Sequence, residues 1–160
     1  ISHNFNVVYG SEMSKEEWGV IKQDELLTST SSRFKTGIAE GKFVTPDNDQ
    51  KKIADFSIKV ASEMLGLNIR VSFYDSSGAT VRADYNSETN QLRFNVARID
   101  SKMWKLKNDT IQQEMLDLII HELGHSKGHL HYESEYHKLL TNLGAQLIIM
   151  ALRDPDFFKI

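Results

Sequence analysis

Residues 121–131 read His-Glu-Leu-Gly-His-Ser-Lys-Gly-His-Leu-His, and this stretch organises the rest of the sequence around it. His121 and His125 stand four residues apart, so on a helix their imidazoles share one face and can bind one zinc ion. Glu122 lies beside them, where it can take a proton from a water on that ion. The residues just before His121 are mostly apolar, and they predict that the motif lies on a buried helix over about 109–126.

A zinc site needs a third protein ligand, and His131 is the best placed residue. It follows His125 by six residues, beyond a turn expected at Gly128, where the chain can fold back toward the helix. The run then fits the pattern H-E-x-x-H-x-x-G-x-x-H at every fixed position. Four neighbouring side chains compete for this role, although a solvated turn or helix start explains each of them: His129, Glu133, Glu135 and His137.

Three further residues near the motif are candidates for supporting roles. Asp117 lies one turn before His121 and could orient its ring. Tyr132 and Tyr136 could stabilise an oxyanion. An exposed helix carboxylate and a tyrosine packed at a helix start are the structural alternatives.

The run resembles the zinc-binding sequence of zincin metallopeptidases, and its elongated spacing looks like that of metzincins. His131 leads straight into an expected helix with Tyr136 near its start, which also resembles SprT-like and other small bacterial zincin domains. Metzincins carry a Met-containing turn after the site, whereas Met150 lies within a helical apolar pattern. The motif covers about 118–143, and the order of elements extends the resemblance loosely to 49–152.

This resemblance implies zinc-dependent hydrolysis of a peptide bond, with a metal-bound water activated by Glu122. The implied cofactor is Zn²⁺, with His121, His125 and His131 as its ligands, and the implied partner is a peptide or protein substrate. An alternative is a zinc-stabilised regulatory or interaction domain with little or no turnover, as part of a larger multidomain protein. Glu122 favours the enzyme because a structural zinc site needs no base.

Hydrophobic periodicity predicts an α+β fold for the rest of the chain. Apolar residues recur every three or four positions over about 50–65, which indicates a helix, and alternate over three short segments between about 68 and 97. The short links predict a three-stranded antiparallel sheet. A C-terminal helix is expected over about 134–152. The expected organisation is zincin-like, with an N-terminal extension or linker over 1–48 and one domain over 49–160.

In the zincin arrangement that this chain resembles, the strand Thr80–Tyr85 would form a free sheet edge beside the metal. An extended peptide could pair with such an edge. Arg82 and Asp84 fit the position, because charged side chains usually guard exposed edges. The structural alternative is an ordinary hairpin strand that binds nothing.

The amino-acid composition excludes some classes of binding partner and some kinds of catalytic or metal site. The chain has no cysteine, so a thiolate zinc site and a cysteine nucleophile are excluded. The net charge of −3 gives no basic field for nucleic acid, and no apolar stretch reaches the roughly 18–20 residues of a membrane span. We expect a cytoplasmic protein, and a fragment of a longer chain because the sequence begins with Ile1. The substrate preference, the oligomeric state and any further domain, such as an ATPase module, stay open.

Overall fold

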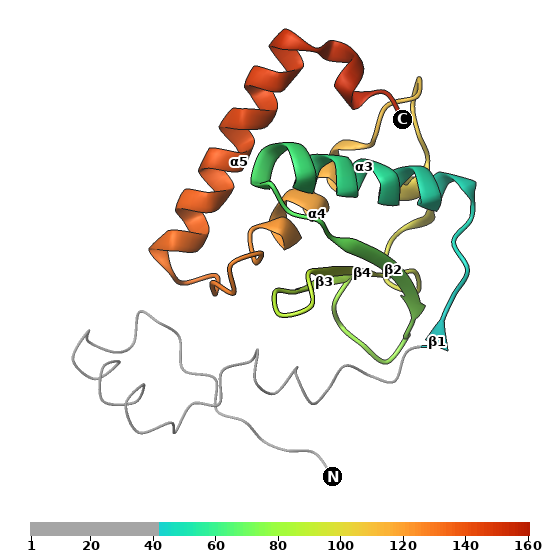
Figure 1. Cartoon of the computed structure of the whole chain (residues 1–160). Helices are drawn as coiled ribbons and strands as arrows, with labels where there is room; N and C mark the ends of the chain where they lie inside the picture. Colours follow the sequence, from blue (N-terminus) through green and yellow to red (C-terminus); the bar gives the residue numbers. More distant parts are fainter. Residues whose placement is uncertain (1–41) are drawn as a thin grey trace, which may run out of the picture. The chain divides into compact units, whose positions relative to one another are not determined.

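The computed structural model of the chain describes residues 42–160, which form an α+β fold (Figure 1). Of the extension expected over 1–48, only residues 42–48 fall within this part. The elements follow one another in the order β1 (Lys42–Phe43), α3 (Asn48–Leu65), β2 (Arg70–Asp75), β3 (Ala83–Asn86), β4 (Gln91–Asn95), η2 (Ser101–Trp104), α4 (Gln113–Leu123), α5 (Ser134–Arg153) and η3 (Pro155–Phe158).

The four strands form a mixed sheet in the order β1-β2-β4-β3. The strands β2 and β4 pair in parallel, whereas β1 and β3 run antiparallel to their neighbours. The expected three-stranded antiparallel sheet is therefore wrong, and β1 was not predicted. The strand β4, which carries the fully buried Leu92 and Phe94, lies in the interior of the sheet beside β2, and β3 lies at the edge.

A buried asparagine holds the link that carries the chain from β2 past β4 to β3. The Asn95 side-chain oxygen accepts a hydrogen bond from the Ser76 amide at 3.1 Å, and its amide group donates to the carbonyls of Ser76 and Val81 at 2.9 and 3.2 Å. Asn95 has no exposed surface, so these bonds satisfy a polar group that would otherwise be costly to bury. The link is thereby fixed in the position that sends β3 to the far side of β4.

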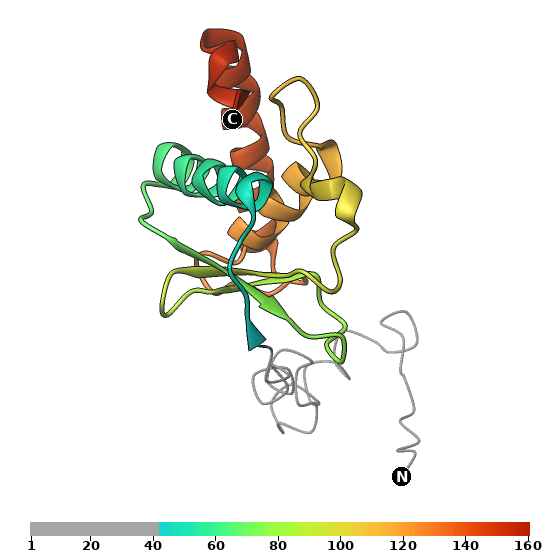
Figure 2. The same cartoon turned by 90° about the vertical axis from the view of Figure 1, so that its right-hand side faces the viewer.

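The helices pack on one face of this sheet, as two perpendicular views show (Figures 1 and 2). Phe73 and Phe94 stack between β2 and β4 with ring centroids 5.7 Å apart, and Trp104 packs against both rings. The helix α5 in turn contacts α3 and α4. The resulting core holds the inner face of the sheet and the motif-bearing helix α4 in one body.

The first and last long helices confirm the sequence prediction. Asp47 caps α3 through a reciprocal pair of hydrogen bonds with Gln50, and Gly66 ends it in the left-handed conformation at φ 65°. The helix α5 spans Ser134–Arg153, within one residue of the expected end. None of the helices within 42–160 has both the length and the apolar character needed to cross a membrane.

The helix α4 is shorter than predicted at both ends. It begins at Gln113, because Asn108 and Asp109 adopt left-handed φ values of 54° and 58° and form a tight turn instead of a helix start. It ends at Leu123, so the expected helix over 109–126 is wrong in its boundaries. As a result, His121 and Glu122 lie on the helix, whereas His125 lies just beyond its end.

Candidate metal centre

The apolar stripe of α4 carries Glu122 into the protein interior. Met115, Ile119 and Leu123 on this stripe have no exposed surface. Glu122 follows Met115 by seven positions and Ile119 by three, so it lies on the same side of the helix and is 6% exposed. His121, its neighbour, is only partly buried. The helix therefore holds a buried carboxyl group beside an accessible imidazole.

After Leu123 the backbone tightens instead of unwinding. The amides of His125 and Ser126 bond to the carbonyls three residues back, at 3.0 Å each. This extra turn keeps the His125 ring close to that of His121, with ring centroids 5.5 Å apart. Gly128 then reverses the chain with a left-handed φ of 76°. The spacing in the sequence thus correctly predicts that His121 and His125 lie close together, even though the regular helix ends before His125.

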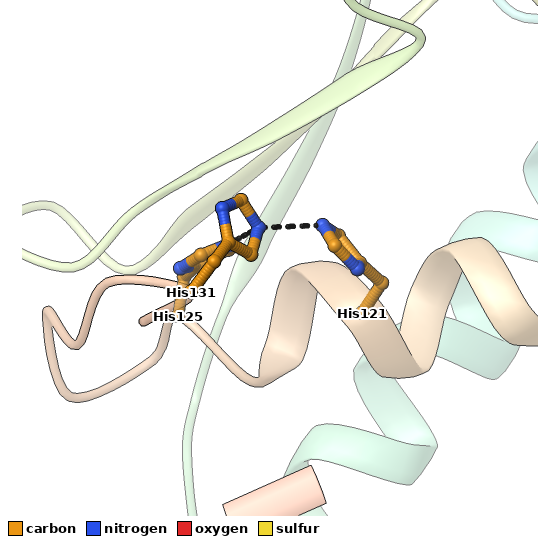
Figure 3. Close-up of side chains that lie close together, drawn as sticks. All are labelled: His121, His125 and His131. Carbon is orange, nitrogen blue, oxygen red and sulfur yellow. Dashed lines mark hydrogen bonds between the residues drawn. The ribbon is translucent and has the colours of Figure 1, made fainter. Parts of the chain in front are cut away.

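The structure brings His121, His125 and His131 together (Figure 3). The Nε2 atom of His131 lies 3.0 Å from the Nε2 atoms of both His121 and His125. Candidate ligand atoms of the three side chains all lie within 4.8 Å of one another, close enough to hold one metal ion. Within residues 42–160 this is the one group of three or more potential ligands.

Hydrogen bonds to the opposite ring nitrogens leave two of the Nε2 atoms free to act as ligands. His125 Nδ1 lies 2.8 Å from the His129 carbonyl, and a carbonyl only accepts, so this nitrogen carries the proton. The Tyr136 hydroxyl lies 3.0 Å from His121 Nδ1 and 3.3 Å from the His121 carbonyl. Both contacts are satisfied if Nδ1 donates to the hydroxyl and the hydroxyl donates to the carbonyl. Each neutral ring then presents a bare Nε2.

The electrostatics of the site favour metal ligation. Burial lowers the pKa of His121 and of His125, and the neighbouring imidazoles lower that of His121 further. Burial also raises the pKa of Glu122 to about 8, with the charge of Asp84 adding to the increase and that of Arg82 opposing it. Bare imidazole nitrogens 3.0 Å apart repel one another unless a proton or a cation lies between them, so these residues fit a metal ion.

The competing residues do not join this cluster. The His129 ring lies 3.4 Å from the Glu133 carboxylate, which also accepts the Leu130 amide at 2.7 Å. Glu135 interacts with Ser134 and Lys138 at the surface, and His137 is exposed. These residues instead shape the loop that carries His131 and the start of α5.

The hydroxyl of Tyr136, and not the carboxylate of Asp117, contacts the His121 ring. No hydrogen bond joins Asp117 to His121 among the described residues, although its negative charge favours the protonated form of that ring. The hydroxyl of Tyr136 reaches His121 Nδ1 from α5. The sequence carried one signal for the contact between Tyr136 and His121: Gly124 has no side chain, so another part of the chain can lie close to the motif.

Comparisons of the chain with protein-family models, with curated proteins and with solved structures found no match.

Proposed function

We propose that this protein is a zinc-dependent hydrolase that cleaves peptide bonds at the three-histidine cluster. The observation that carries the proposal is the convergence of three histidine Nε2 atoms, one of them from a residue that a buried glutamate follows directly in sequence. Imidazole suits several transition metals, and the glutamate that follows His121 favours zinc among them. The proposal includes a peptide or protein substrate and a cytoplasmic location.

In this proposal His121, His125 and His131 hold the ion. Bound zinc supplies Lewis-acid chemistry, polarising the scissile carbonyl and making a nearby water more acidic. Glu122, in its ionised form, takes the proton from the attacking water and delivers it to the leaving nitrogen. Glu122 is 6% exposed, so the surrounding packing restricts the movement of its side chain.

The number of ligands favours catalysis over a purely structural role. Structural zinc sites are usually closed by four protein ligands, whereas catalytic sites keep one position for water or substrate. Within residues 42–160 three histidines, and no further His, Asp or Glu side chain, meet at the cluster, and His131 is exposed. This arrangement supports an accessible fourth position and counts against the alternative of a closed, zinc-stabilised interaction domain.

The edge strand β3 is suited to bind an extended substrate beside the cluster. It pairs with β4 on one side and with no other described strand. It also contacts α4, and the Ser87 hydroxyl at its end lies 3.4 Å from the position that a Cβ on Gly128 would take. The edge therefore runs past the loop that carries His131, which is where a peptide has to lie to reach the ion.

The hydrogen-bond pattern of β3 points one backbone donor toward the free edge. The Asn95 amide bonds to the Arg82 carbonyl at 2.8 Å, so the polar backbone groups of Arg82 face β4. Those of Ala83, the next residue, then face the opposite side. We expect Ala83→Pro, which removes this donor, to lower kcat/KM by roughly 10-fold or more, and also to lower stability because Ala83 is buried. Ala83→Ser keeps the donor, and equal kinetics for the two variants would contradict substrate pairing at β3.

The hydrolase itself is tested by incubating the zinc-loaded protein with a mixed peptide library and identifying cleaved bonds by mass spectrometry. The matched control is Glu122→Gln, which keeps the shape of the side chain and removes the base. We expect cleavage by the parent and a loss of about 10²–10⁴-fold in the variant at unchanged zinc content. Equal cleavage by both proteins would exclude Glu122 as the base, and zinc binding without any cleavage would favour the interaction domain.

A further inference from the structure

Tyr136 lies in the first turn of α5 and touches every histidine of the cluster. Its ring stacks on that of His125 with centroids 4.7 Å apart and an interplanar angle of 30°. It meets the rings of His131 and His121 edge-on, at 5.0 and 5.9 Å. The side chain is 2% exposed, so these contacts are held by the surrounding packing.

The hydroxyl of Tyr136 also makes directional hydrogen bonds to His121. A neutral imidazole carries one proton, and whichever nitrogen holds it cannot bind a metal ion. By accepting from His121 Nδ1 and donating to the His121 carbonyl, the hydroxyl favours the tautomer whose Nε2 is bare. His125 obtains the same selection from the His129 carbonyl, so Tyr136 supplies for His121 what the backbone supplies for His125.

Gly124, within the motif, allows this approach. A Cβ built on Gly124 would lie 2.8 Å from Cε2 of Tyr136 and 2.7 Å from Cδ2 of Leu140, both closer than such contacts allow. Its backbone is right-handed, with φ −58°, so a left-handed turn does not explain the glycine. The glycine instead lets the first turns of α5 lie directly against the histidine motif.

We infer that Tyr136 is a positioning residue of the metal centre, which selects the ligating tautomer of His121 and holds the rings of His125 and His131 in place. The inference rests on the proposed function in one respect, that a metal ion binds at the cluster. It does not depend on peptide hydrolysis. Gly124 contributes to this positioning because its lack of a side chain lets the Tyr136 ring lie close to the motif.

The test is Tyr136→Phe, which keeps the ring and removes the hydroxyl. We expect the affinity for zinc, measured by competition with a chromophoric chelator, to fall by about 10–100-fold, as for the loss of other partners of metal-bound histidines. In the metal-free protein, ¹⁵N NMR of the imidazoles should show His121 shifting from the Nδ1-protonated toward the Nε2-protonated form. A purely structural role would leave both measurements unchanged.

Tyr85→Phe is the matched control. It also removes one tyrosine hydroxyl with a hydrogen bond, to Asn90 at 3.1 Å, and we expect it to leave both readouts unchanged. If Tyr136→Phe does not fold, Gly124→Ala displaces the tyrosine without removing its hydroxyl and should weaken zinc binding in the same way. Zinc affinity within about twofold of the parent and an unchanged His121 tautomer would overturn the inference.

Failure of the hydrolase can be recognised separately. A parent that binds zinc tightly, loses affinity with Tyr136→Phe and cleaves no peptide supports the positioning role and contradicts the proposed activity. A parent that cleaves peptides and whose Tyr136→Phe variant binds zinc equally well supports the activity and contradicts the positioning role. A parent that takes up no zinc overturns both.

Discussion

The helix α4 and the loop over residues 124–133 both contribute to the histidine cluster, but they hold their residues by different means. The helix fixes His121 and Glu122 through its backbone hydrogen bonds and through a stripe of side chains with no exposed surface. The loop holds His125 and the exposed His131 through a few separate hydrogen bonds and the left-handed Gly128. The comparison shows that Glu122 is buried and His121 partly buried on a regular helix, whereas His125 and His131 are held by a few local contacts, and we expect a bound ion to stabilise them.

We expect the largest effect from His131, the proposed third ligand, which lies in the loop. His131→Ala should reduce the affinity for zinc by at least about 100-fold, because the loss of an outer partner of a ligand alone commonly costs 10–100-fold. The measurement is a chelator competition on the purified variants. His137→Ala removes an exposed histidine outside the cluster and should leave the affinity as it is. Unchanged zinc binding in His131→Ala would remove this residue from the ligand set.

Removal of the metal tests whether the loop depends on the ion more than the helix does. At a free zinc concentration of about 100 times Kd, binding stabilises the liganded state by about 2.7 kcal/mol. We therefore expect chelation to speed hydrogen exchange of the loop amides of Gly128, Leu130 and Glu133 by up to about 100-fold. The amides of Ile119 and Leu123, deep in α4, should change far less. Equal acceleration in both regions would show that the loop is no more dependent on the ion than the helix.

A pair of glycines provides the smallest expected effect. Gly124→Ala forces a Cβ against Tyr136 and Leu140, and overpacking of this kind costs about 1–3 kcal/mol of stability. Gly144, inside α5, has nothing within 4 Å of an added Cβ, so Gly144→Ala should stabilise the protein by roughly 0.5–1 kcal/mol. Urea unfolding of the two variants measures the difference. Equal destabilisation would mean that the close approach at Gly124 is not what constrains this position.

Sequence predicts the parts of this protein whose signals are local. The cap at Asp47 and the glycine at Gly66 bracket α3, and the spacing of the three histidines brings them together within eleven residues of chain. The turn at Asn108 and Asp109 also had a signal, because both residue types tolerate the left-handed conformation. Reading that signal would have placed the start of α4 correctly.

The strand order and the partner of His121 required information from distant residues. The position of β3 depends on how Asn95 binds a link that lies 14 to 19 residues earlier in the chain, and strand alternation does not report this contact. Tyr136 follows His121 by fifteen residues and reaches it from another helix. Its role depends on a hydroxyl position that periodicity cannot give, since the same pattern predicts only a buried aromatic at the start of a helix.

In the proposed metal centre, three histidines hold one zinc ion and a fourth position stays open for chemistry. X-ray absorption at the zinc edge of the loaded protein tests this arrangement most directly. We expect one ion per chain with three imidazole nitrogens at about 2.0–2.1 Å and one oxygen from solvent. A first shell with fewer than three imidazoles, or one closed by a fourth protein ligand, would contradict it.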